Sequence, residues 1–187
     1  MNRTRLIPFT LATLLLAGCN GHGDHLTLVS TGHTSIDNGA IEVANDEVTL
    51  HPDHAAPAAI GGNGDFTVDG KPVDITPAQR ALLVQYYIGA IGVREHGLET
   101  GKAGAAIAGE AVKGVVSSIA GSSDKSASAN ARAQGEKVKQ AAMKICDDLA
   151  SIRDAQDQLI NQLPAFKPYG SLITADSVDE CRKGDNG

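Results

Sequence analysis

Two short segments of this chain bring histidine and aspartate side chains together. They are His22-Gly23-Asp24-His25 and His51-Pro52-Asp53-His54, and both have the form His-x-Asp-His. Imidazole and carboxylate groups are good zinc or copper ligands, so the two clusters could close one metal site. Both segments lie in loop-like sequence, where ligands are not preset. The alternative is that His22, His25, His51 and His54 are solvated histidines.

A third reactive side chain is Cys19, in the run Leu16-Ala17-Gly18-Cys19. This run follows Arg3, Arg5 and an apolar stretch over residues 6–16. A basic start, a short apolar core and small residues before a cleavage point are typical of an export signal. The four residues resemble the lipobox of bacterial lipoproteins. That resemblance implies a signal peptide over residues 1–18, cleavage before Cys19 and a lipid on its sulfur.

The predicted lipid decides the expected location of the protein. The apolar stretch holds 11 residues, whereas a membrane-spanning helix needs roughly 20. We therefore expect a lipid anchor facing the periplasm rather than a transmembrane span. Asn20, not Asp, follows the cysteine, which by resemblance to lipoprotein sorting rules favours the outer membrane. The alternative is an ordinary secretory signal with a chance cysteine.

The remaining cysteines are Cys146 and Cys181. An exported protein meets an oxidising compartment, so a disulfide between them is the simplest prediction. A free thiol or a metal ligand is the alternative.

No pattern in the chain predicts an enzyme. Residues 97–103 look faintly like a phosphate-binding loop, but the glycines are too close together and alanine follows Lys102. The 16 Lys and Arg face 22 Asp and Glu, a net charge of −6. Loss of Arg3 and Arg5 with the signal makes the mature charge −8. This balance argues against nucleic acid as a partner.

The first part of the mature chain predicts a tether and then short strands. Residues 19–35 are rich in Gly, His, Ser and Thr, and we expect them to form a flexible tether. Residues 36–76 contain alternating apolar positions and predict a β-meander. We expect residues 51–64, rich in Pro, Gly and Ala, to form a loop. Asp69-Gly70 predicts a two-residue hairpin, and Pro72 predicts an edge strand.

Residues 77–187 predict long helices. Thr76-Pro77-Ala78-Gln79 is a capping box with proline at the first helical position, so a helix should run from there to about Glu95. A second long helix is expected from about Ala131 to Leu163, with an apolar stripe interrupted only by Gln156. The predicted fold class is α+β: an antiparallel meander, then two or three long antiparallel helices within a single domain, residues 36–187.

Between these two helices, residues 97–121 predict a helix with one face of small side chains. Such a face allows close helix approach, so we expect it to pack inside a helical hairpin. It could also contact another copy of the protein or insert into a bilayer. Its small residues are Gly97, Gly101, Gly104, Ala105 and Ala108.

Two patches of the chain resemble the YggN-like family of exported bacterial proteins of unknown function. The first is residues 63–73 with Thr76, Gln79-Arg80 and Tyr86-Tyr87. The second is Ile145-Cys146 with Leu149 and Ile152, followed by residues 163–169. The resemblance implies an envelope protein and supplies no site residues. We therefore expect a non-enzymatic envelope lipoprotein that binds another envelope protein or itself. The alternatives are a periplasmic metal-binding protein that uses the histidine pairs and a membrane-active protein that uses the helix rich in Gly and Ala.

Overall fold

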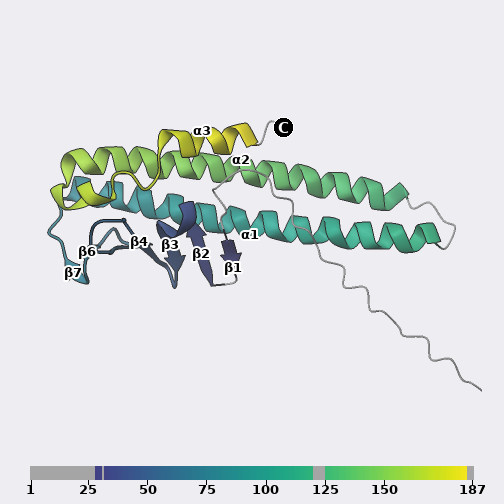
Figure 1. Ribbon diagram of the computed structural model, residues 1–187, viewed down its shortest axis with the longest axis horizontal. Helices are drawn as coiled ribbons and strands as arrows, with labels where there is room; N and C mark the ends of the chain where they lie inside the picture. The colour runs from purple at the N-terminus through teal and green to yellow at the C-terminus, as the bar shows by residue number, and fades with distance from the viewer. Residues whose placement is uncertain (1–27, 31, 120–124, 185–187) are drawn as a thin grey trace, which may run out of the picture.

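The structure is a computed structural model that describes residues 28–30, 32–119 and 125–184. Cys19, His22 and His25 lie outside the described residues. The described chain is α+β, as predicted: an antiparallel sheet is followed by two long antiparallel helices and a short C-terminal helix (Figure 1).

The sheet is a meander of seven antiparallel strands whose spatial order is their order along the chain. Its strands are β1 (Leu28–Ser30), β2 (His33–Ile36), β3 (Ile41–Ala44), β4 (Glu47–Leu50), β5 (Ala58–Gly61), β6 (Phe66–Val68) and β7 (Lys71–Pro72).

The period-two pattern explains the sheet. Ile41, Val43, Val48 and Leu50 are all fully buried, because alternate residues of a strand point to the same face. The predicted hairpin is confirmed: Asp69 and Gly70 have φ values of 52° and 69°, and Val68 pairs with Lys71. The predicted edge position of Pro72 is confirmed as well, since β7 is the last strand of the sheet.

Two expectations for this part of the chain are wrong. The tether expected over residues 19–35 ends earlier, because β1 and most of β2 fall inside that range. The loop expected over residues 51–64 contains β5. Both segments are rich in small or polar residues, yet the inward positions of β2 and β5 are buried and complete the alternation.

Helix α1 (Pro77–Ile119) begins as predicted. The backbone N–H of Thr76 donates to Oε1 of Gln79 at 2.8 Å, and the N–H of Gln79 donates to Oγ1 of Thr76 at 3.3 Å. This reciprocal pair is the expected capping box. The predicted end at about Glu95 is wrong, because α1 continues without a break through Gly97 and Gly101. Helix α2 packs along α1 and supplies the tertiary contact that glycine-rich helices need.

Helix α2 (Lys125–Gln162) starts six residues before the expected Ala131. A 3-10 helix, η2 (Pro164–Tyr169), follows it at Pro164, and α3 (Ala175–Gly184) is the last described element. The N–H of Ser177 donates to Oγ1 of Thr174 at 3.1 Å, which caps α3.

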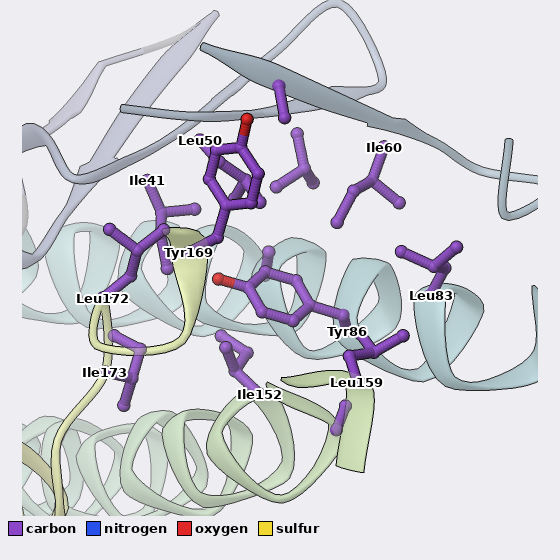
Figure 2. Close-up of a cluster of buried hydrophobic side chains, with 14 of the residues drawn as sticks. Ile41, Leu50, Ile60, Leu83, Tyr86, Ile152, Leu159, Tyr169, Leu172 and Ile173 are labelled. Carbon is purple, nitrogen blue, oxygen red and sulfur yellow. The ribbon is translucent and has the colours of Figure 1, made fainter. Parts of the chain in front are cut away.

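The core lies where the sheet, α1 and α2 meet. Figure 2 shows Leu50 and Ile60 from the sheet, Leu83 and Tyr86 from α1, and Ile152 and Leu159 from α2 pointing toward one another. Four aromatic rings pack within this core, with centroids 5.6–6.0 Å apart: Phe66, Tyr86, Phe166 and Tyr169. Burial raises the pKa of the Tyr86 phenol far above its usual range.

Gln156 interrupts the apolar stripe of α2 because its side chain forms hydrogen bonds to the backbone of the segment between η2 and α3. Its side chain is buried, and its Nε2 donates to the carbonyl oxygens of Gly170 at 3.0 Å and Ile173 at 2.9 Å. Its Oε1 accepts from the N–H of Ile173 at 3.1 Å. The amide therefore satisfies backbone groups that the core would otherwise leave unpaired.

The two long helices form a hairpin that extends beyond the rest of the protein. In Figure 1 the sheet lies against only the N-terminal half of α1, and α3 lies against only the C-terminal half of α2. We call the projecting part, residues 97–119 of α1 and 125–144 of α2, the distal hairpin. It presents helix surface that neither the sheet nor α3 covers in this view.

Candidate functional site

The small residues predicted as a contact face form an exposed stripe on the distal hairpin. We call this set the small-residue stripe: Gly97, Gly101, Gly104, Ala105 and Ala108. Gly97 is half-buried, and the other four are exposed. Among the described residues, a β-carbon added at Gly101 or Gly104 would meet no atom within 4 Å. The exposed Val112 extends the stripe by one further turn.

The stripe does not pack inside the hairpin, so that expectation is wrong. Ala103, which is buried, marks the side of α1 that meets Ala141 of α2. At 100° per residue, Ala103 lies about 160° from Gly101 around the helix. The helical period correctly grouped the small residues on one face, but the partner helix packs on the opposite face.

Close approach of α1 and α2 occurs instead at Gly89 and Gly92. A β-carbon at Gly89 would lie 2.7 Å from Cγ1 of Ile152 and 3.1 Å from the backbone oxygen of Asp148. A β-carbon at Gly92 would lie 2.6 Å from the Asp148 carboxyl group. No motif in the sequence pointed to these two glycines, although their spacing of three places them on one helix face.

A histidine–carboxylate pair joins the two helices one turn beyond Gly92. Nδ1 of His96 lies 2.7 Å from Oδ2 of Asp148, and each side chain is less than one-quarter exposed. Desolvation raises the pKa of the Asp148 carboxyl above its usual value, and the hydrogen bond from His96 partly opposes that rise. The pair therefore joins α1 to α2 next to the base of the distal hairpin, and no motif in the sequence marked it.

The described half of the predicted metal site is only partly assembled. His51 and His54 line one cavity of about 760 Å³, together with Asp37 and Asp53. Nε2 of His51 lies 3.3 Å from Oε2 of Glu42. Within residues 28–30, 32–119 and 125–184, no three His, Cys, Asp or Glu side chains are placed to hold a metal ion.

The predicted disulfide is confirmed. Cys146 and Cys181 are bonded, with their Cα atoms 5.6 Å apart. The bond fixes α3 against α2 at the boundary between the body and the distal hairpin. The predicted lipidation site, Cys19, lies outside the described residues.

No protein family, curated protein or solved structure matches this chain. In the described part of the chain, no helix combines the length and the apolar character required to cross a membrane. The resemblance to the YggN-like family and the membrane-active alternative stay predictions from the sequence.

Proposed function

We propose that this protein is a non-enzymatic lipoprotein of the bacterial envelope, tethered by a lipid on Cys19, that binds another envelope protein or a second copy of itself. The contact surface in this proposal is the small-residue stripe. One observation carries it: the stripe is exposed on the projecting part of the hairpin, where α2 does not reach it.

The energetics of α1 support a contact at the stripe. Glycine inside a helix costs up to about 1 kcal/mol relative to alanine. No neighbouring atom in the described part of the chain requires glycine at positions Gly101 and Gly104, because a β-carbon there would meet nothing within 4 Å. Small residues allow the backbone of a second helix to approach closely, and the gain in dispersion contacts then offsets the cost of the glycines.

A matched pair of substitutions tests the contact surface. Ala108→Arg places a long cation on the stripe. Ala106→Arg adds the same group to an exposed position about 160° away around the helix. Crosslinking in intact cells, followed by mass spectrometry, should show a crosslinked species that Ala108→Arg removes and Ala106→Arg keeps. Monomer alone in the wild type, or equal loss in both variants, would count against the proposal.

The tether needs its own test. Cells producing the wild-type protein should incorporate radiolabelled palmitate into it, and a Cys19→Ser variant should not. A purified product that still begins with methionine would contradict the lipoprotein assignment.

A second candidate function is periplasmic zinc binding. The observation that favours it is that His51 and His54 line the same cavity. Zinc titration by calorimetry should give heat that a variant with alanine at His22, His25, His51 and His54 loses. Absence of heat at micromolar zinc, or unchanged heat in the variant, would remove this candidate.

A further inference from the structure

The charge of this chain is unevenly distributed along its length. Residues 97–119 and 125–144 contain seven Lys or Arg against three Asp or Glu, although the whole chain is acidic. Residues 28–96 and 145–184 together contain seven Lys or Arg against 16 Asp or Glu. The projecting part of the protein is therefore basic and the body is acidic, a contrast that the net charge conceals.

Part of this positive charge lines a groove between α1 and α2. The groove has a volume of about 370 Å³, within the range of small-molecule sites. Ala103 and Ala141 are buried and line it between the two helices. Its remaining lining side chains are Glu99 and Lys102 from α1, and Gln134, Lys137, Gln140 and Lys144 from α2.

The spacing on α2 explains why its side chains converge. Gln134, Lys137, Ala141 and Lys144 follow steps of three, four and three residues, which place them on one helix face. Lys102 reaches the same groove from α1. Within the described residues, neither Lys102 nor Lys137 forms an ion pair, whereas Nζ of Lys144 lies 4.0 Å from Oε2 of Glu99. Two of the three ammonium groups thus lack a carboxylate partner among the described residues.

We propose that this groove binds a phosphate-bearing anion. Three ammonium groups and the NH₂ groups of two side-chain amides can donate hydrogen bonds to an anion. A phosphate group offers several acceptor oxygens and up to two negative charges. A single carboxylate would match fewer of these donors. Glu99 opposes the anion, because its carboxylate competes for Lys144. The inference concerns a different surface from the small-residue stripe and does not rest on the proposed function.

The test is a titration of the full chain with inorganic phosphate, followed by ¹H–¹⁵N NMR. Saturable shifts should be centred on the amides of Ala103 and Ala141. Because the lysines are exposed, each substitution in the pair Lys137→Gln and Lys144→Gln should weaken binding by about two- to fivefold. Glu99→Gln should tighten binding, since it removes the competing carboxylate. Higher ionic strength should weaken binding.

Lys139→Gln is the matched control. Lys139 is exposed on α2 but does not line the groove, so this variant loses the same charge and should bind phosphate like the wild type. Equal weakening by Lys139→Gln and Lys137→Gln would overturn the proposal, because binding would then follow overall charge. Absence of saturable shifts in the wild type, or weaker binding in Glu99→Gln, would overturn it as well.

A second arm separates the two sources of the phosphate group. Phosphatidylcholine vesicles with and without phosphatidic acid are sedimented with a Cys19→Ser variant of the full chain, so that no lipid anchor contributes, in the presence and absence of inorganic phosphate. Binding that requires phosphatidic acid, and that Lys137→Gln weakens but Lys139→Gln does not, identifies a lipid headgroup. Phosphate-dependent NMR shifts without sedimentation identify a free phosphorylated molecule.

Discussion

Replacing Gln156 by methionine tests whether its buried amide holds the end of the chain in place. Methionine is unbranched and similar in size, so the substitution removes the polar atoms and preserves most of the packing. The variant loses three hydrogen bonds, two to the backbone of Ile173 and one to the carbonyl oxygen of Gly170.

The structure sets the expected magnitude. Both hydrogen bonds to Ile173 are buried, and each backbone group left without a partner costs about 1–3 kcal/mol. The carbonyl group of Gly170 is partly exposed and can turn to water, so its loss costs less. Additional apolar burial by methionine offsets part of the total. We expect the free energy of unfolding to fall by about 3 kcal/mol.

Urea denaturation followed by circular dichroism, with the disulfide intact, measures this change. Gln158→Met is the control, because Gln158 lies two residues further along α2 with an exposed side chain. Hydrogen exchange at the Ile173 amide should accelerate in Gln156→Met alone. A Gln156→Met variant within about 0.5 kcal/mol of the wild type, the usual effect of a surface substitution, would refute the reasoning.

Three further predictions concern the helix interface. Gly89→Leu should lower the free energy of unfolding by about 1–3 kcal/mol through overpacking. Gly109→Leu, at a site with open space around it, should raise the free energy of unfolding by about 0.5–1 kcal/mol. Equal effects of the two substitutions in thermal melts would contradict this expectation. Joint substitution of Cys146 and Cys181 by serine should cost about 4 kcal/mol for a 35-residue loop, measured against oxidised wild type in urea, and an unchanged midpoint would exclude the chain-entropy argument. Because the fold raises the pKa of Asp148, its native carboxyl binds a proton more tightly than the unfolded one. Its ionisation therefore lowers stability as pH rises above about 3.8. The stability of Asp148→Asn relative to the wild type should therefore increase as the pH rises from about 3.8 to above the raised pKa of Asp148. A difference that does not change with pH would contradict a raised pKa for Asp148.

The elements that obey local rules could be predicted from the sequence. Asp69-Gly70 specifies its hairpin through the backbone conformation that both residues adopt readily. Thr76 and Gln79 specify the start of α1 through two reciprocal hydrogen bonds. The disulfide followed from the number of cysteines and the expected compartment.

The features that depend on distant partners could not be predicted. Helix α1 continues past Glu95 because α2 packs beside it. The sequence predicted a helix over residues 97–121, but not that it would be continuous with the helix that begins at Pro77. The periodicity of the small-residue stripe showed that these residues share one helix face, but not whether that face points toward α2 or toward solvent. A helical period is the same on the inside and the outside of a hairpin. The role of Gln156 was hidden for a related reason: the backbone groups that it satisfies belong to a loop 14–17 residues further along the chain.

The early start of the sheet limits how far an anchored molecule can stand from its membrane. Nine residue steps separate Cys19 from Leu28, the first residue of β1, and an extended chain covers at most about 30 Å over that length. Strand β1 contacts α1 near the middle of the hairpin, not at either end (Figure 1). About 22 further helical residues, half of α1, add roughly 33 Å. A lipid on Cys19 would thus attach the molecule near the middle of its long axis. The far end of the distal hairpin could then contact only partners within about 60 Å of the membrane surface.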